Sequence, residues 1–211
     1  MYRLPAPART FSHEFEVKRS RFLTYIRRVQ NAEEARAFIA EIKSQFPDAR
    51  HHCSAFIYHV DGANPVERSS DDGEPSGTAG QPMLDVLRGC GMLDIAAVVV
   101  RYFGGVKLGT GGLVRAYSDA VSGCLDEVVS VRRELRELYS IEFDHDVAGR
   151  LEAELRNRGF DVAEVTYGAR VTVTIAANPG DYDAVAATVS SLMQRSVPVA
   201  KAGQRWVEKA D

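Results

Sequence analysis

Apolar residues recur along the chain with two different periods, and the changes between them predict alternating strands and helices. The clearest early helix has Asn31 in position to cap it, Glu34 three residues later, and apolar side chains at Ala35, Phe38 and Ile42. This is the sequence signature of a helix N-terminus followed by a buried helical face. Strands are expected around it, because short runs rich in aromatic and β-branched residues favour strands. They lie at residues 15–17, 22–29 and 54–60.

The next segment, residues 61–79, is dense in Asp, Gly, Pro and Ser, and we expect no regular element in it. Loops of this length are often functional. A helix is predicted from Pro82, since proline is tolerated in a first helical turn. Residues 95–103 begin with the unbroken apolar run 95–100, which predicts a strand buried on both faces. A glycine loop at 104–112 follows, and then a clean helical stripe from Leu113.

The second half of the chain predicts the element order strand, helix, strand, strand, helix, strand. Its strands include residues 139–143, 171–175 and 198–207, and its helices carry apolar stripes beginning at Val147 and Tyr182. This βαββαβ order predicts a ferredoxin-like domain. We place the seam in the charged stretch 132–137. The chain is thus expected to be α+β, with one domain at 1–132 and another at 133–211, a division that its 211 residues favour.

Composition limits the classes of partner. The chain has 45% hydrophobic residues and a net charge of -3, and its pI is near 6.0. The chain is therefore not a protein that coats nucleic acid with a basic surface over its whole length. Nucleic acid would have to bind through a local basic patch.

Sequence features also favour a cytoplasmic protein without a membrane segment. Cys53, Cys90 and Cys124 show neither a disulfide framework nor a metal-binding pair, so reduced thiols are expected. The first seven residues lack the apolar core of a signal peptide, and the longest apolar run, 95–100, is too short to cross a bilayer.

The glycine loop carries the strongest chemical signal. Glycines let backbone N–H groups approach a ligand, and a helix start adds unpaired N–H groups with a partial positive charge. We therefore expect a phosphate or nucleic-acid contact at this strand-to-helix junction. The candidate residues are Arg101, Gly104, Gly105, Lys107, Gly109, Thr110, Gly111, Gly112 and Arg115.

Standard nucleotide motifs do not fit this loop. A P-loop needs its lysine directly after the last glycine, whereas Lys107 precedes Gly109; a dinucleotide fingerprint would need glycine where Val114 stands. The alternative is that the glycines only permit a tight turn. Five glycines in nine positions exceed what a turn requires, which favours the contact.

Accessory chemistry is possible in the preceding loop, where Asp71, Asp72 and Glu74 are hard oxygen ligands of the kind that hold Mg²⁺ beside a phosphate. The competing interpretation is a solvated loop whose side chains cap turns, and we favour it. His51 is expected to be a partly buried, hydrogen-bonded residue near the glycine loop. No metal site has recognisable spacing, no cofactor is expected, and no residue is singled out as catalytic.

These same segments resemble the Impact family, in its bacterial two-domain branch. The resemblance rests on residues 48–53, 70–84 and 98–117, of which the last two are long and specific. It implies a first domain with the fold of the second domain of a small-ribosomal-subunit protein, an α/β sandwich. It also implies that the ferredoxin-like domain is similar to the last domain of the translocation elongation factor.

The resemblance further implies a link to translation, because eukaryotic relatives act in translational control. Those relatives carry an accessory domain that is absent here, so their partner is not carried over. Our leading hypothesis is a non-enzymatic regulator of translation or stress response that binds RNA, the ribosome or a translation factor. The alternatives are a Mg²⁺-dependent enzyme acting on a phosphorylated small molecule or nucleotide, and a protein-interaction module.

Overall fold

In the computed structural model, which describes residues 1–210, the apolar run becomes the central strand β6 (Ile95–Tyr102) of a sheet. Its residues 95–100 have no exposed surface, because helices cover both faces of the sheet. Each neighbour of β6 is antiparallel to it. The strand order is β2 (Thr10–Val17), β3 (Ser20–Arg28), β6, β4 (His51–Tyr58) and β5 (Val66–Ser70).

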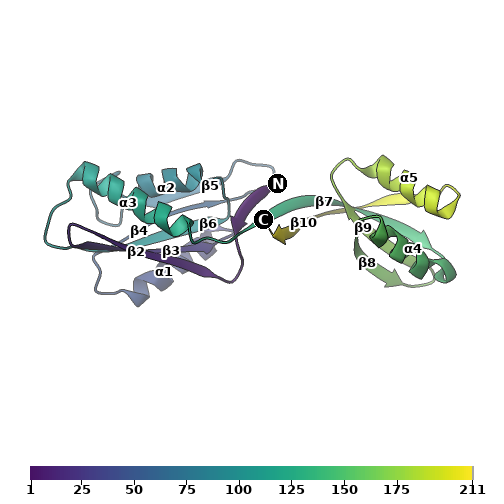
Figure 1. Ribbon diagram of the computed structural model, residues 1–211, viewed down its shortest axis with the longest axis horizontal. Helices are drawn as coiled ribbons and strands as arrows, with labels where there is room; N and C mark the ends of the chain where they lie inside the picture. Colours follow the sequence, from purple (N-terminus) through teal and green to yellow (C-terminus); the bar gives the residue numbers. More distant parts are fainter. Residues whose placement is uncertain (211) are drawn as a thin grey trace. The chain divides into compact units, whose positions relative to one another are not determined.

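Three helices complete this first unit, which is built mainly from residues 2–132. Helix α1 (Ala32–Gln45) packs on one face of the sheet, and α2 (Gly80–Gly89) and α3 (Thr110–Leu125) pack on the other (Figure 1). The predicted cap of α1 is confirmed, since the Asn31 side chain accepts a hydrogen bond from the Glu34 N–H at 2.9 Å. The result is the α/β sandwich that the resemblance implied.

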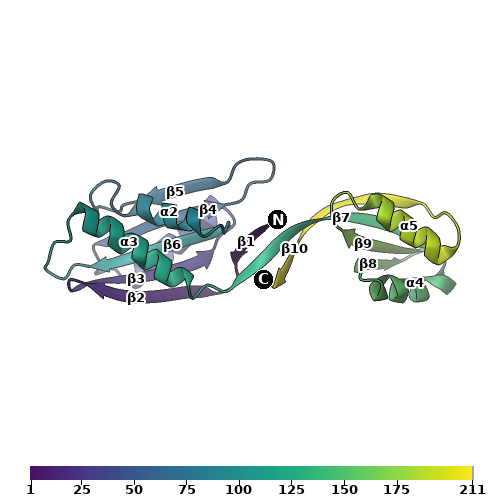
Figure 2. The ribbon, with the colours of Figure 1, turned by 45° about the horizontal axis from the view of Figure 1, so that its top comes forward.

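One element of this unit differs from the sequence prediction. Residues 61–79 were expected to hold no regular structure, yet residues 66–70 form the edge strand β5, which lies beside α2 (Figure 2). Both of its faces are largely solvated, so the strand shows no apolar alternation that sequence analysis could detect. The strand β1 (Tyr2–Pro5) was also not foreseen; the Ala6 N–H beside it donates to the Val129 carbonyl at 2.8 Å.

The second unit, mainly residues 133–208, has the predicted ferredoxin-like order. Its sheet runs β10 (Val199–Ala210), β7 (Ser130–Phe143), β9 (Val171–Ala177) and β8 (Asp161–Tyr167). Helices α4 (His145–Asn157) and α5 (Tyr182–Met193) share one apolar core with the sheet, including Tyr139, Leu151 and Val185. The charged stretch 132–137 lies inside the long strand β7, and the two units divide at its start, between residues 132 and 133.

No helix within residues 1–210 is both long enough and apolar enough to span a membrane.

Candidate nucleic-acid and anion interface

The glycine loop connects the end of β6 to the start of α3. Gly105 and Gly109 have φ values of 84° and 75°, in the left-handed region that favours glycine. Gly104 has a different reason: a Cβ there would collide with the backbone carbonyl of Arg19, in the turn between β2 and β3. The fold therefore requires three of the glycines, and the turn hypothesis accounts for these.

Gly111 is different because nothing in the fold requires it. It lies in the first turn of α3, its φ is not in the left-handed region, and an added Cβ would meet no atom within 4 Å. Glycine in a helix costs up to about 1 kcal/mol relative to alanine, so its presence calls for another reason. Gly112 is intermediate, since its Cβ would lie 3.1 Å from the Cβ of Leu108.

The N-terminus of α3 presents its backbone donors outward. Gly109 is the N-cap residue and offers no side-chain cap. The first N–H of this helix with a partner is that of Leu113, which donates to the Gly109 carbonyl at 2.9 Å. Within residues 1–210, no group accepts a hydrogen bond from the N–H of Thr110, Gly111 or Gly112, and the first two of these residues are exposed. Such an end is suited to bind an anion.

Cationic side chains surround these donors. Lys107 is exposed, and Arg115 is more than four-fifths exposed, with only a weak contact of 3.7 Å to Asp119. Lys18 and Arg19 form the β2–β3 turn, where both have positive φ. A hollow of about 360 Å³ lies between this turn and α3, and Lys18, Gly112 and Arg115 all line it.

Apolar side chains are also exposed at the junction. Phe103 is 52% exposed and Val106 is 42% exposed. The Phe103 ring lies 5.7 Å from the guanidinium carbon of Arg101, which packs against it from the protein side. An exposed aromatic ring close to basic residues in the fold is a surface on which single-stranded bases can stack.

Arg101 itself must be reassigned. We expected it to lend charge to the loop, but it is only 6% exposed, and its Nη1 donates to Glu74 Oε1 at 2.6 Å. Its ion pair is buried at both ends. Arg101 is the second last residue of the central strand β6, and there its side chain lies under the junction instead of on its surface. Arg101 therefore supports the loop from below.

The Glu74 carboxylate also anchors α3 and β4. Tyr117 of α3 donates its hydroxyl hydrogen to Glu74 Oε1 at 2.8 Å, and the Cys53 thiol of β4 lies 3.3 Å from the Tyr117 oxygen. Burial raises the pKa of Cys53 to about 12 and also raises the pKa of Tyr117. Cys53 and Tyr117 are therefore neutral at physiological pH, and Cys53 is a structural thiol.

Asp71 organises the loop that precedes α2. Its carboxylate accepts hydrogen bonds from the N–H groups of Gly77, Ala79 and Gly80, at 2.8, 3.0 and 2.8 Å. Partial burial raises the pKa of Asp71, but these three donors outweigh it and hold the pKa below its usual value. Asp71 thus caps the start of α2, which is the structural role that we favoured for this loop.

Asp72 and His51 are also engaged by protein groups. Asp72 accepts from the His52 N–H at 2.7 Å and pairs with Lys43 at 2.7 Å, contacts that lower its pKa despite partial burial. The His51 Nδ1 lies 3.0 Å from the Asp72 carbonyl oxygen. Asp71, Asp72 and Glu74 therefore each bind neighbouring protein donors. Within residues 1–210, no three His, Cys, Asp or Glu side chains gather as metal ligands.

Sequence reasoning missed Lys18 and Arg19. They adjoin the glycine loop only through the fold, where the Ser20 hydroxyl accepts a hydrogen bond from the Gly104 N–H at 3.2 Å across 84 residues. The available signal was the pair of basic residues between two predicted strands, which marks an exposed turn.

Comparisons with known proteins show which family the chain resembles. Residues 18–125 match the Impact N-terminal domain, and residues 141–194 match a domain of unknown function. The chain is 37% identical to the Impact family member YvyE of Bacillus subtilis, covering 94% of this chain and 90% of that one. It is 39% identical to the Impact family member YigZ of Escherichia coli, covering 76% and 79%.

A Haemophilus influenzae member of the same family is 42% identical over 75% of this chain and 80% of its own. A crystal structure described as that of a hypothetical protein superposes with a TM-score of 0.61 at 34% identity, covering 94% of this chain and 97% of the other. The two-domain α+β architecture is thus shared along almost the whole length. The chain belongs to the Impact family.

Proposed function

We propose that this protein is a translation-associated regulator whose first unit binds RNA, as part of the ribosome or free, at the N-terminus of α3. The observation that carries the proposal is the set of outward N–H groups at Thr110, Gly111 and Gly112, which have no partner within residues 1–210. Phosphate groups fit such donors because the helix end also carries partial positive charge.

Three further features favour RNA over a free small anion. Lys18, Arg19, Lys107 and Arg115 provide four positive charges around the junction, more than a single small anion needs. Phe103 offers a base-stacking surface beside them. Family membership supports the link to translation, and the proposal implies a cytoplasmic location.

The contacts of the acidic loop do not favour the enzyme alternative. Asp71 and Glu74 already bind backbone and side-chain donors, so a Mg²⁺ ion would have to displace them. The proposed role is therefore recognition and regulation, in which the acidic loop shapes the interface and leaves the binding to the junction.

A salt series with ribosomes tests the proposal. We expect the intact protein to co-sediment with ribosomes, with an affinity that falls steeply as salt rises. Lys107→Ala should weaken binding and reduce the logarithmic salt slope by about 1, because one phosphate contact is lost.

The matched control is Arg36→Ala, which removes one exposed cation from α1 on the opposite face of the same sheet. It should leave both affinity and salt slope unchanged. The proposal fails if the protein does not bind ribosomes or isolated ribosomal RNA at low salt, or if the two variants behave alike.

A further inference from the structure

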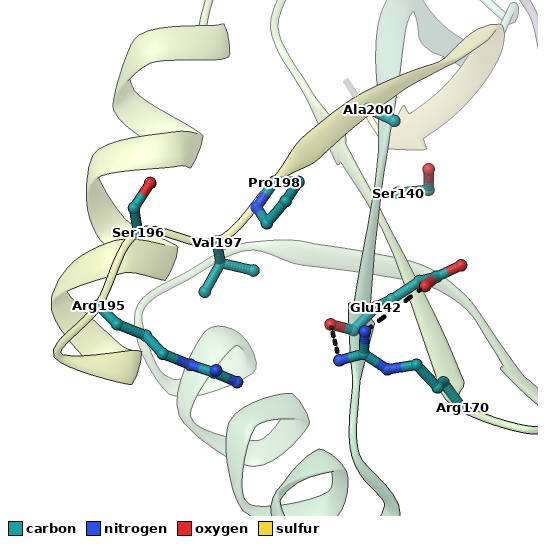
Figure 3. Close-up of a pocket in the computed structure, with 8 residues that line it drawn as sticks. All are labelled: Ser140, Glu142, Arg170, Arg195, Ser196, Val197, Pro198 and Ala200. Atoms are coloured by element: carbon teal, nitrogen blue, oxygen red, sulfur yellow. Dashed lines mark hydrogen bonds and ion pairs between the residues drawn. The ribbon is translucent and has the colours of Figure 1, made fainter.

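A second hollow lies in the ferredoxin-like unit, away from the residues discussed above. Its volume is about 260 Å³, and it opens between β7 and the segment that leads into β10 (Figure 3). Arg170 and Arg195 enter it from opposite sides. The space is a little below the usual range for drug-sized ligands, so it suits a small one.

Local structure explains how this hollow forms. Gln194 ends α5 with a φ of 52°, a left-handed residue that reverses the chain and releases Arg195 from the helix. Val197 is 9% exposed and is anchored in the core of the unit. Along β7, Tyr139 and Ile141 face that core, so the alternating residues Ser140 and Glu142 face the hollow.

Arg170 retains hydrogen-bond donors in spite of its acidic neighbours. Its Nη2 donates to the Glu142 carbonyl oxygen at 3.3 Å, and its Nε lies 3.3 Å from Asp144 Oδ1. Its Nη1 is 3.8 Å from Glu142 Oε2, which is beyond hydrogen-bond distance. The Nη1 hydrogens are therefore available to a ligand.

Arg195 provides the second cation. Its side chain makes no hydrogen bond or ion pair within residues 1–210, while its backbone N–H donates to the Ser190 carbonyl at 3.2 Å. The chain reversal therefore fixes the backbone of Arg195, while all the N–H donors of its guanidinium are free to bind a ligand. Glu142 and Asp144 both lie beside Arg170, whereas no carboxylate pairs with Arg195 within residues 1–210, and this balance favours a singly charged anion over a highly charged one.

We infer that this hollow binds a small anionic ligand, with one carboxylate or phosphate group held between Arg170 and Arg195. A guanidinium can bind either group through two parallel hydrogen bonds. Ser196 also lines the hollow, with its hydroxyl directed away from the two arginines (Figure 3). Val197 and Pro198 form an apolar wall that fits a short hydrocarbon part of the ligand.

The test uses the full-length chain labelled with ¹⁵N and titrated with sodium phosphate or sodium butyrate at constant ionic strength. Saturable shifts are expected for the amide signals of Ser196 and Val197. Arg195→Gln should weaken this binding about tenfold, since a charged double hydrogen bond is lost. Comparison of the two anions distinguishes a phosphate ligand from a carboxylate ligand.

Arg156→Gln is the matched control, because Arg156 is an exposed arginine of the same unit that pairs with Glu152 on α4 at 2.9 Å. It should leave the titration unchanged. The inference is overturned if neither anion gives saturable shifts at these amides, if Arg195→Gln binds as well as the unmodified chain, or if phosphate shifts only the amides of residues 107–113.

Discussion

Arg101 and Glu74 form a buried ion pair, 2.6 Å from Nη1 to Oε1, that joins the glycine junction to the acidic loop. The Arg101 guanidinium carbon lies 5.6 Å from the ring of Phe22 and 5.7 Å from that of Phe103. The two most distinctive segments of the sequence therefore meet in one interior contact, and that contact supports the exposed Phe103 ring.

Removing the charge of Glu74 should destabilise the first unit strongly. Glu74→Gln keeps the shape of the side chain but leaves the buried Arg101 cation without a counter-ion. We expect a loss of about 3–5 kcal/mol in the free energy of unfolding. Urea unfolding followed by circular dichroism measures it.

The control is Glu14→Gln, which removes the counter-ion of Arg21 from a pair of the same type, 2.8 Å apart, whose side chains are half exposed. Water solvates both charges there, so the expected loss is about 0–1 kcal/mol. Equal effects of the two substitutions would show that burial of the Arg101 pair carries no special energetic weight.

The order of elements could be predicted from the sequence because strong local signals mark it. The Asn31 cap, the apolar run of β6 and the stripe of α3 each lie within about 16 residues and need no tertiary information. β5 was missed because an edge strand solvated on both faces has no apolar period. The first half of β7 was missed because charges fill it.

Sequence analysis predicted only the part of the candidate site whose residues are adjacent in the sequence. The glycine junction was found, but the meeting of Gly104 with Ser20 depends on strand pairing across the sheet. Arg101 was assigned to the surface because a charged residue is rarely buried, and its partner Glu74 lies 27 residues away with no pattern linking them. The hollow likewise brings together Arg170, from the connection between β8 and β9, and Arg195, from the connection between α5 and β10.

The thiols should be nearly inert in the folded protein. Burial raises the pKa of Cys53 and of Cys124 to about 12, and it also raises the pKa of the half-buried Cys90. At pH 8 a thiol with such a pKa is about one part in ten thousand thiolate, the reactive form. A disulfide reagent should therefore react slowly, first at Cys90, and rapidly at all three cysteines in guanidinium chloride.

Mass spectrometry after limited reaction assigns the modified cysteine. Fast labelling of Cys53 in the native protein would contradict its structural role beside Tyr117.

Asp71 should make the stability of the first unit depend on pH in the acid range. Its folded-state pKa is lowered, so its contribution is fully present above its unfolded value, about 4, and is lost as pH falls through the folded value. Asp71→Asn should therefore melt at a lower temperature than the unmodified protein at pH 6, and the difference should shrink below about pH 4.

Thermal melts from pH 6 to pH 3 measure this difference. Asp119→Asn serves as the control, because Asp119 has only the weak, exposed contact with Arg115. A deficit of Asp71→Asn that stays constant over the whole range would mean that its three backbone donors do not depend on the negative charge.

Gly111→Ala should separate stability from binding at the proposed interface. The new methyl group meets no protein atom within 4 Å, so the fold should tolerate it and gain up to about 1 kcal/mol from a less flexible unfolded chain. The same methyl group would stand beside the N–H groups of the first turn of α3, where phosphate is proposed to bind. We expect ribosome affinity to fall about two- to fivefold, the value of an anion at a helix end.

Gly149→Ala is the matched control, since Gly149 lies inside α4 and also has no atom within 4 Å of an added Cβ. It should stabilise the second unit similarly and leave RNA binding unchanged. If Gly111→Ala stabilises the protein and binds ribosomes as tightly as before, the amides at this helix end do not contact phosphate. The extra glycine would then be only a neutral feature of the turn. If Gly111→Ala is more stable but binds ribosomes more weakly, the glycine leaves the backbone N–H groups accessible to phosphate, at a cost in stability that the fold does not require.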